Sequence, residues 1–497
     1  MSSATGTILP CRQAGSMVKP LFLVGLALIV LTGFASCRDN SGPSFPQPQL
    51  RRQLPTRTDG NVVRLNPKMR GDMLPVLTGL CYVPLEHTNL IREVDSKLLQ
   101  LDQLFDIVIP VAMTSNGIQQ DLSKIDPLLE GLRLSGAQPL ITLDFTPSAL
   151  SPRPHLENSK RRSAPPTSYG DWEQLVFELA SYVVIEKGIG VAYWSVWNEP
   201  DLGMFWDVAH AGYTQYAATA PGSDLWTPGS KRTEAQGQFN EMARILEYMS
   251  LYEATVKGIL RVDPSARVGG PNTSSFSKRW IAVVLNQCVE RDLPLDFVAW
   301  HYPGSRTEIT ERVAWLRTKS ASLGIGPPAV LITEWNADHG KGWEPWAEAM
   351  GSLDIIEGMA AAGVEASFYY TYGRLLDANP AKLTPMGKAF RFLGDMSGFQ
   401  VGVSTTVGTN ALGTIASDNS LRVLLWSDHP VDGRFSIQMD PSIPSDSYAS
   451  CILEIVGEKG PSLTATYEDI ADGRVEFSLP DAGRILAYLI LSPSNEL

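Results

Sequence analysis

The feature that most constrains the fold is a repeated alternation that starts at Leu74. Short apolar runs alternate there with longer segments whose apolar residues recur every three to four positions. The runs are typical of buried parallel strands, and the longer segments of helices that cover them. The predicted strands are Pro75–Tyr82, Phe105–Ala112, Pro139–Phe145, Ala192–Glu199, Ala266–Asn272, Leu295–Tyr302, Ala329–Glu334 and Glu365–Tyr372. Eight strand-helix units predict an α/β fold, a (β/α)8 TIM barrel.

The chain has 497 residues, more than one usual core, so we expect a second and smaller domain. After Phe399 the helical pattern gives way to short alternating runs such as Leu421–Trp426. They predict a C-terminal β-sandwich at 398–497, behind a catalytic barrel at 67–397. This domain is either a packing partner of the barrel or a carbohydrate-binding module, and Asn61–Leu65 is a candidate additional strand of it.

The N-terminal region carries the pattern of an export signal. Residues 20–35 are apolar and uncharged, and Lys19 precedes them, so we expect a lipoprotein signal peptide at 1–36 with Met17 as a candidate true start. Phe34-Ala35-Ser36-Cys37 resembles a bacterial lipobox, which predicts a lipid anchor on Cys37 and a cell-envelope lipoprotein, periplasmic or surface-exposed. Soluble secretion and an uncleaved anchor are the alternatives. Residues 37–66, rich in Pro, Gln and Ser over 41–55, are expected to form a flexible linker.

The net charge and the spacing of the cysteines limit the kinds of molecule that the protein is expected to bind. A net charge of −12 leaves no basic footprint for nucleic acid and suits a neutral polymer as substrate. The five cysteines show no paired spacing, so neither a zinc site nor a disulfide framework is predicted. No cofactor or metal is implied, and the lipid would make a membrane an expected partner.

Two predicted strands end in a carboxylate beside an amide. Ala192–Glu199 ends in Asn198-Glu199, where Pro200 stops the strand, and Ala329–Glu334 is followed by Trp335-Asn336. Barrel enzymes carry their chemistry at such strand ends, and two carboxylates at one rim are the minimum apparatus of a glycosidase. Each glutamate taken alone also fits an ion pair or a helix cap, and the sequence does not assign which one is the acid.

Other strand ends turn polar or aromatic together. Amides, carboxylates and aromatic rings complement the hydroxyls and flat faces of a sugar. The candidate substrate-binding residues at these ends are Asn198, His301, Tyr302, Trp335, Asn272 and Asp144. Two irregular stretches, Ser151–Ser168 and the aromatic-rich Gly203–Gln238, follow strand ends and are expected to be rim loops.

At these residues the chain resembles glycoside hydrolase family 39, within the clan of retaining (β/α)8-barrel glycosidases. The resemblance runs in order across about Leu74 to Phe392. Its pieces are Asp144-Phe145-Thr146-Pro147, Tyr169-Gly170-Asp171-Trp172, Val196-Trp197-Asn198-Glu199-Pro200-Asp201-Leu202 with Phe205-Trp206, Val262-Asp263-Pro264, Val268-Gly269-Gly270-Pro271, Asp296-Phe297 with His301, and Ile332-Thr333-Glu334-Trp335-Asn336.

The resemblance implies a general acid/base at Glu199, a nucleophile at Glu334 and an amide for the sugar's 2-hydroxyl at Asn198. It also implies that His301 or Tyr302 orients the nucleophile. Ser367–Gly373 departs from the tryptophan-led pattern frequent in the family's xylosidases, which leaves the sugar open. The expected function is a retaining glycoside hydrolase acting on a xyloside-like or related glycan. The expected partner is therefore a glycoside or an oligo- or polysaccharide substrate. A non-catalytic glycan-binding lipoprotein and a transglycosidase are the alternatives.

Overall fold

The structure is a computed structural model. It describes residues 61–84, 88–156, 158–208, 234–337, 344–377, 382–405, 408–429, 433–444, 446–459, 462–468, 470, 474–479 and 483–494. The predicted signal peptide, Cys37 and the linker as far as residue 60 lie outside these ranges. Within them, no helix combines the length and the apolar character needed to cross a membrane.

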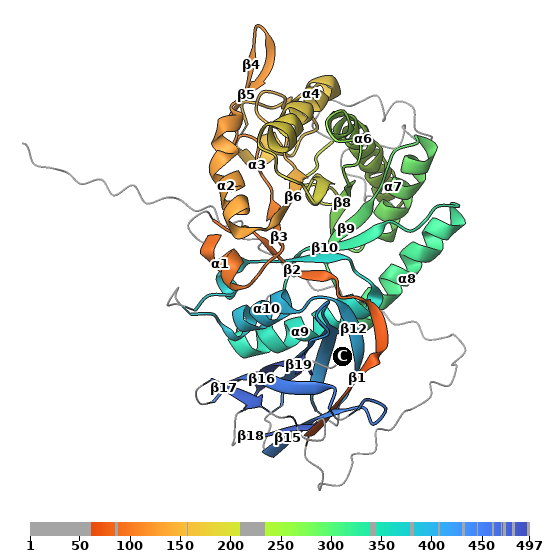
Figure 1. The fold of residues 1–497 in the computed structure, drawn as a ribbon. Coiled ribbons are helices and arrows are strands. Elements are labelled where there is room, and N and C mark those ends of the chain that lie inside the picture. Colours follow the sequence, from red (N-terminus) through yellow and green to blue (C-terminus); the bar gives the residue numbers. More distant parts are fainter. Residues whose placement is uncertain are drawn as a thin grey trace, which may run out of the picture. The chain divides into compact units, whose positions relative to one another are not determined.

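Eight parallel strands close a barrel in the described part of the chain, so the predicted TIM-barrel fold is confirmed (Figure 1). Around the barrel the strands follow the order β10, β11, β2, β3, β6, β7, β8, β9, and β9 pairs again with β10. Their bounds are Ala329–Trp335, Ala366–Tyr369, Val76–Cys81, Leu98–Leu101, Gln138–Leu143, Tyr193–Val196, Val268–Ser275 and Phe297–Tyr302. Every strand therefore brings its carboxyl end to the same mouth.

The predicted second strand, Phe105–Ala112, is wrong. The barrel strand in that place is β3, which ends at Leu101. Asp106 has a left-handed backbone (φ 63°), Phe105 bridges only to Ile109, and Pro110 follows. The chain then forms an antiparallel hairpin, β4 (Val111–Thr114) and β5 (Gly117–Gln120), outside the barrel. The β-branched run of 107–111 is typical of a strand, but a left-handed residue and a proline prevent continuous pairing.

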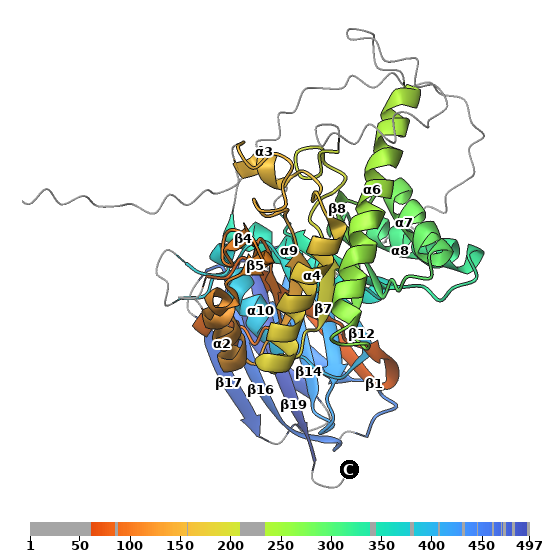
Figure 2. The same cartoon turned by 90° about the horizontal axis from the view of Figure 1, so that it is seen from above.

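Helices surround the strands, as the alternation of short and long apolar-patterned segments predicts. The barrel helices are α1 (Thr88–Glu93), α2 (Asp126–Ser135), α4 (Tyr169–Ala180), α6 (Glu234–Leu260), α7 (Lys278–Glu290), α8 (Arg306–Ser322), α9 (Pro345–Ala362) and α10 (Pro385–Asp395). A π-helical turn, Ser181–Glu186, continues α4, a 3-10 turn, Leu122–Ile125, precedes α2, and the short α3 covers Asn158–Arg162. Figure 2 shows α4 beside α6, and the indole N–H of Trp172 joins them by donating to Thr255 Oγ1 at 2.8 Å.

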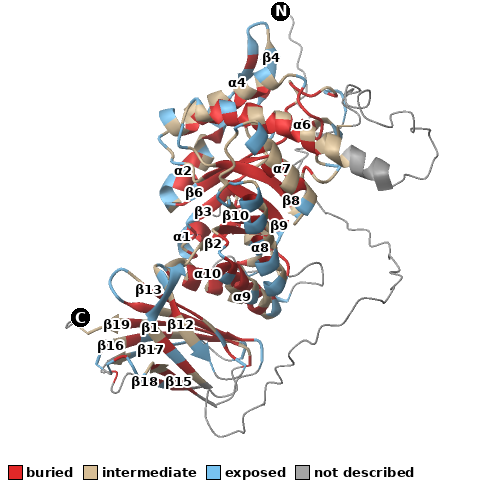
Figure 3. Ribbon diagram, turned by 90° about the vertical axis from the view of Figure 1, so that its right-hand side faces the viewer, coloured by how far each residue is buried: buried red, intermediate tan, exposed pale blue. Residues whose placement is uncertain are grey.

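Two apolar layers hold the barrel together. Inside it, Leu140, Phe297, Leu331 and Phe368 pack in one cluster. Between strands and helices lies a larger cluster that includes Trp172 and most of the other large buried rings. Figure 3 accordingly shows the barrel strands almost wholly buried and the helices exposed on their outer sides. Side chains on successive strand residues face these two layers in turn.

The second domain is a nine-stranded sheet of the described residues. Its strand order is β17, β16, β19, β14, β13, β12, β1, β15, β18. The bounds are Leu463–Glu468, Tyr448–Gly457, Ile485–Pro493, Leu421–Ser427, Asn410–Ile415, Phe399–Thr405, Asn61–Met73, Gly433–Met439 and Arg474–Leu479. Residues from both ends of this order share one core, so the sheet packs against itself as in a sandwich.

The most N-terminal strand belongs to this C-terminal sheet. β1 pairs antiparallel with β12 and parallel with β15. Val63 and Leu65 are fully buried in the sheet core, which explains the alternation seen at Asn61–Leu65. The expected linker up to residue 66 and the expected barrel start at 67 are therefore corrected, because Asn61–Met73 lies in the sheet.

The sheet is joined to the barrel helices by hydrogen bonds and by aromatic stacking. Asp354 on α9 accepts hydrogen bonds from the Trp426 indole and the Asn410 amide, both at 2.9 Å. On α10, Phe392 stacks on Tyr488 with ring centroids 4.8 Å apart. These contacts fit a packing role for the second domain.

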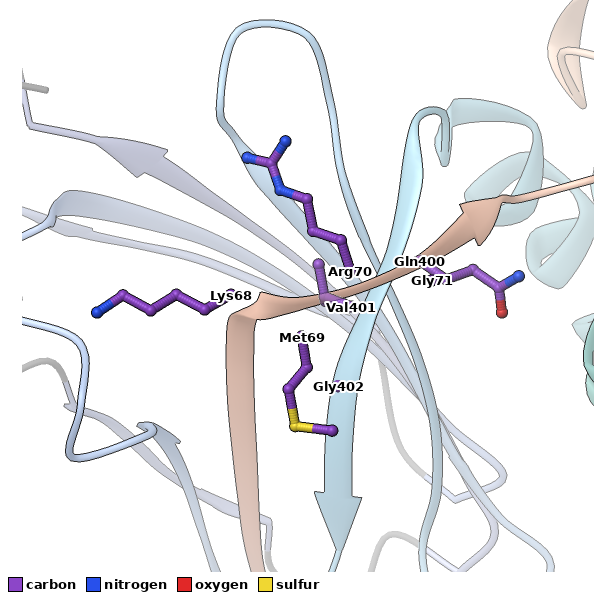
Figure 4. A pocket seen from close by; sticks show the side chains of 7 residues that line it. All are labelled: Lys68, Met69, Arg70, Gly71, Gln400, Val401 and Gly402. Carbon is purple, nitrogen blue, oxygen red and sulfur yellow. The ribbon is translucent and has the colours of Figure 1, made fainter.

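A hollow of about 440 Å³ lies on the sheet where β1 crosses β12 (Figure 4). Its lining residues are Lys68, Met69, Arg70, Gly71, Gln400, Val401 and Gly402. They include no carboxylate, and they come from the sheet rather than from the barrel mouth. The catalytic apparatus must therefore be sought at the strand ends.

Candidate active site

Both predicted catalytic glutamates have an irregular backbone. Glu334 has φ 58° and Glu199 has φ 46°, in the left-handed region that side chains other than glycine seldom adopt. In β10 two residues lie between Ile332 and Trp335, whereas only one lies between their partners in β11, Ser367 and Tyr369. This extra residue is a bulge, and bulges re-aim side chains at strand ends. Left-handed residues of this kind persist where the surrounding structure holds them, which is common at functional sites.

His301 lies between the two carboxylates. Its Nδ1 is 3.1 Å from Glu199 Oε1 and 3.8 Å from Glu334 Oε2. The two oxygens therefore cannot be further apart than the sum of these distances, about 6.9 Å. Retaining glycosidases separate their carboxyl groups by about 5–5.5 Å and inverting ones by about 6.5–9.5 Å. An oxygen-to-oxygen distance within this limit is compatible with the retaining separation.

Tyr82 is a member of the site that the sequence reasoning missed. Its hydroxyl, at the end of β2, donates to Glu334 Oε1 at 3.2 Å. Glu334 is thus contacted on one oxygen by Tyr82 and approached on the other by His301. The only available signal was that Tyr82 ends a predicted strand.

Burial and mutual charge set the protonation of this group. Burial raises the pKa of Glu334 above its ordinary value; the charge of His301 opposes this and the charge of Glu199 adds to it. Burial by itself lowers the pKa of His301, but the carboxylates of Glu334 and Glu199 outweigh it, so the pKa lies above the ordinary value. A cationic imidazole between two acids can hold one of them ionised while the other keeps a proton.

Asn272 holds the strand ends beneath the carboxylates rather than facing a substrate. Its amide nitrogen donates to Ser195 Oγ and to the Trp197 carbonyl, the latter at 2.9 Å. Its amide oxygen accepts from Thr333 Oγ1 at 3.3 Å. The side chain is fully buried and its amide is bonded within the protein, so the predicted substrate contact is replaced by a positioning geometry.

Asp144 and a second acid, Asp102, lie on the other side of the mouth. Asp144 is fully buried at the end of β6, where Oδ1 accepts the Gln103 N–H at 2.8 Å. Burial raises its pKa to about 7. Asp102 follows β3, and burial together with Asp144 and Glu334 raises its pKa well above the ordinary value. The sequence reasoning missed Asp102 because it placed the second strand one segment too late.

The remaining predicted site residues divide into two groups. Asn198 is 6% exposed, and its Oδ1 is buried without a partner in the described ranges, so it is available to a ligand. Trp335, in contrast, is buried in the layer between strands and helices, where it packs edge-on against Tyr369. Tyr302 is 38% exposed, and Arg312 lies over its ring. The structure does not bring Trp335 or Tyr302 to the carboxylates. Of the two candidates for orienting Glu334, His301 and Tyr302, it is His301 that lies beside the carboxylates.

The described parts of the two predicted rim loops are held by aromatic packing and by an ion pair. Phe145 stacks on Phe205, and Trp197 packs edge-on against Trp206. Arg153 reaches Asp207 at 3.0 Å and so joins the two irregular stretches. Three further aromatic residues of the stretch Gly203–Gln238, namely Tyr213, Tyr216 and Trp226, lie outside the described residues.

Neighbouring acids have other partners. Asp201 accepts from Ser274 through the backbone N–H at 2.9 Å and the hydroxyl at 2.7 Å. Glu344 caps the first turn of α9 and pairs with Arg484 at 2.8 Å. Glu199 and Glu334 are therefore the pair that faces one imidazole at the mouth.

Several known proteins that are similar to this chain are glycosidases. A family model described as "Glycosyl hydrolases family 39" matches residues 98–223 and 233–322. A beta-xylosidase of Caldicellulosiruptor saccharolyticus is 29% identical over 235 residues, which cover 43% of this chain and 40% of that protein. One from Geobacillus stearothermophilus is 29% identical over 181 residues, or 36% and 29% of the two chains. The matched part thus spans about two fifths of the first relative and less of the second.

Solved structures agree over almost the whole fold. A monomeric beta-xylosidase from Caulobacter crescentus superposes with a TM-score of 0.63 at 15% identity and covers 87% of this chain and 99% of that one. A structure described as the GH39 enzyme from Xanthomonas axonopodis pv. citri gives 0.63 at 17% identity, with 90% and 100% covered. At such identities the likeness shows the fold alone, a barrel with an attached sheet.

Proposed function

Because this chain is glycoside hydrolase family 39-like, we propose that it is a retaining glycoside hydrolase that cleaves the O-glycosidic bond of a xyloside-like glycan. The observation that carries the proposal is His301 Nδ1 lying 3.1 Å from Glu199 and 3.8 Å from Glu334 at one barrel mouth. The names of the relatives, beta-xylosidases, support a β-xyloside as the substrate.

In the first step the Glu334 carboxylate attacks the anomeric carbon and forms a glycosyl ester. The bond to the leaving oxygen breaks, and Glu199 gives that oxygen a proton. In the second step Glu199 takes a proton from water, the water oxygen bonds to the anomeric carbon, and the ester bond to Glu334 breaks. Both glutamates then regain their starting protonation, and the product keeps the anomeric configuration of the substrate.

The environment of the two acids supports this division of labour. Burial raises the pKa of Glu334, whereas the charge of His301 and the hydrogen bond from Tyr82 each lower it, and these two contacts also fix the orientation of the carboxylate. Asn198 directly precedes Glu199 in the sequence, and its Oδ1 has no partner among the described residues, so it is free to accept a hydrogen bond from a sugar hydroxyl. The backbone of Glu199 is held by Asn272, so the acid is positioned independently of the substrate.

The test is a set of aryl glycosides with β-xyloside, β-glucoside, β-galactoside, α-arabinoside and α-iduronide. We expect hydrolysis of at least the β-xyloside, and NMR of the first-formed sugar should show the β-anomer. Formation of the α-anomer first would contradict the retaining mechanism. Binding without turnover across the set would favour a glycan-capturing protein, and transfer to an added sugar in preference to water would favour a transglycosidase.

We also propose that the protein is exported and anchored through lipid on Cys37. Support comes from the apolar segment at residues 20–35 and the lipobox-like Phe34-Ala35-Ser36-Cys37. Cys37→Ser should block processing or release the protein from the membrane fraction. Mass spectrometry of an unlipidated mature N-terminus in the wild type would contradict the anchor.

A further inference from the structure

Three neighbouring strand ends carry buried oxygens that have no partner. They are Asn198 Oδ1 after β7, Asp144 Oδ2 after β6 and Asp102 Oδ2 after β3, judged against the described residues. A buried polar atom left without a hydrogen bond costs about 1–3 kcal/mol. Because β7, β6 and β3 are adjacent in the barrel, the three oxygens form an arc around one side of the mouth. Such an arc indicates a ligand that supplies the missing bonds.

A basic side chain shares this arc. Arg162 is 9% exposed, and its Nε and Nη2 have no partner in the described part of the chain. Its Nη1 lies 3.5 Å from Gln103 Oε1, while the Gln103 N–H donates to Asp144. The guanidinium also lies over the Phe145 ring, 4.8 Å from its centroid. The donors of Arg162 are thus held beside the two aspartates.

Three acids, Asp102, Asp144 and Glu334, lie near one another, and Arg162 is the basic side chain beside the two aspartates. Burial raises the pKa of both aspartates; the charges of Asp144 and Glu334 raise the pKa of Asp102 further, and the charge of Glu334 also raises that of Asp144. Arg162 supplies one positive charge against them. When Glu334 is ionised as the nucleophile, one proton left on the aspartate pair is the arrangement that limits repulsion.

We propose that Asp102 and Asp144 share one proton and together bind two adjacent hydroxyl groups of the terminal sugar, with Arg162 as an additional donor. This inference rests on the function proposed above. A protonated carboxyl donates and an ionised one accepts, so the pair matches hydroxyls that do both. Asn198 is assigned to the 2-hydroxyl by the family resemblance. Around the mouth, Asn198 is followed by Asp144 and then by Asp102. Around the sugar ring, the 2-hydroxyl is followed by the 3-hydroxyl and then by the 4-hydroxyl, so Asp144 is assigned to the 3-hydroxyl and Asp102 to the 4-hydroxyl.

The arrangement defines the substrate class as a neutral sugar with free 3- and 4-hydroxyls. An internal unit of a 4-linked chain has no free 4-hydroxyl, so the site selects the chain end and the enzyme acts in the exo mode. A uronate would add a negative charge beside three acids, with only Arg162 to offset it. We therefore expect a glucuronide to be a poor substrate even though a free guanidinium is present.

The experiment compares 4-nitrophenyl β-xyloside with its 3-deoxy and 4-deoxy analogues, together with the β-glucuronide. The proteins are the wild type, Asp102→Asn, Asp144→Asn and, as a charge-matched control, Asp418→Asn in a turn of the sheet. In the wild type, removal of either hydroxyl should lower kcat/KM by roughly 10²-fold or more. In the aspartate variants, removal of the same hydroxyl should lower kcat/KM by less than about 5-fold, because the substitution has already removed the hydrogen bond between that hydroxyl and the aspartate. The control should behave as the wild type.

The outcomes separate the two proposals. If the wild type cleaves the parent and both deoxy analogues at equal rates, the aspartate pair does not bind these hydroxyls, and the glycosidase function stands. The same conclusion follows if the deoxy penalties persist in both variants, or if the glucuronide is preferred. If the wild type cleaves no glycoside, the proposed function fails and this inference with it. The wild-type arm needs no variant to fold.

Discussion

The backbone N–H of Glu199 donates to the backbone carbonyl of Asn272 at 2.9 Å, and both residues have a left-handed backbone, at φ 46° and 51°. Asn272 in turn bonds Ser195 and Trp197 on the strand that carries Glu199, and Thr333 beside Glu334. One buried amide therefore sets the position of both carboxylates. Each left-handed residue costs about 1–3 kcal/mol, which these bonds offset.

Asn272→Ala is expected to lower stability and activity together. It leaves the Trp197 carbonyl without its amide partner in the core, so we expect a loss of about 2–4 kcal/mol in the free energy of unfolding, measured by urea denaturation. The rate should fall by a similar factor for good and poor leaving groups, because both acids are displaced. Asn116→Ala, in the exposed turn between β4 and β5, is the control. A variant with full activity would show that Asn272 does not position the acids.

Glu334→Ala is expected to abolish turnover, because no other carboxylate faces His301 from β10. Added azide should restore part of the rate and give the glycosyl azide of opposite anomeric configuration. Glu311→Ala, on the exposed side of α8, should keep full activity. Wild-type rates in the Glu334 variant would contradict its role as nucleophile.

Glu199→Gln should show an effect that depends on the leaving group. A general acid matters most when the departing oxygen is basic, so a xylobiose-like bond should lose several orders of magnitude in rate. An activated phenol should keep much of its first step and then show a burst, because the second step lacks its base. Equal losses for both substrates without a burst would leave Glu199 as a positioning residue.

His301→Asn should move the acid limb of the pH profile of kcat/KM. The cation of His301 lowers the pKa of Glu334, so its removal should raise that pKa and shift the limb to higher pH by roughly one unit. Glu199 and Tyr82 also face Glu334 and remain in the variant. His429→Asn, on the sheet, is the control. An unchanged acid limb would exclude this electrostatic role.

Asp144→Asn should change how stability depends on pH. The pKa of Asp144 is about 7 in the folded protein against a usual 3.8, so the folded state binds the proton more tightly than the unfolded one. This contribution is fully present below about pH 4 and is lost as pH rises through 7. Relative to the wild type, the variant should therefore gain on the order of 1–3 kcal/mol between pH 4 and 8, measured by urea denaturation. A constant difference across that range would contradict the raised pKa.

The barrel, and the position of Glu199 and Glu334 at its mouth, could be predicted because their signals are local. Seven of the eight predicted strands overlap barrel strands, and the resemblance to family 39 is supported by the family model. The strand that was missed, Leu-Leu-Gln-Leu at 98–101, is short and lacks β-branched residues, whereas the neighbouring run at 105–112 has them. That error also hid Asp102, which follows the true strand.

Backbone irregularity explains the other differences. Simple alternation along β10 would place Glu334 and Thr333 on opposite faces, but the bulge brings Glu334 to the mouth and leaves Trp335 in the outer layer. A left-handed glutamate cannot be read from sequence, because its own preference opposes it. Tyr302 is displaced for the opposite reason: β9 keeps its alternation, so His301 is buried and Tyr302 is exposed.

The place of β1 has a consequence for how the chain is made. About 325 residues separate the end of β1 at Met73 from its partner β12, which starts at Phe399. At about 5–20 residues per second the ribosome needs roughly 16–65 s to supply that partner, and β15 comes later still. Val63 and Leu65 leave the ribosome before the barrel but can be buried only after it, because the partner strands of β1 follow the barrel in the sequence. A nascent chain halted after the barrel would therefore present β1 as an unpaired strand, available to a chaperone or to another chain.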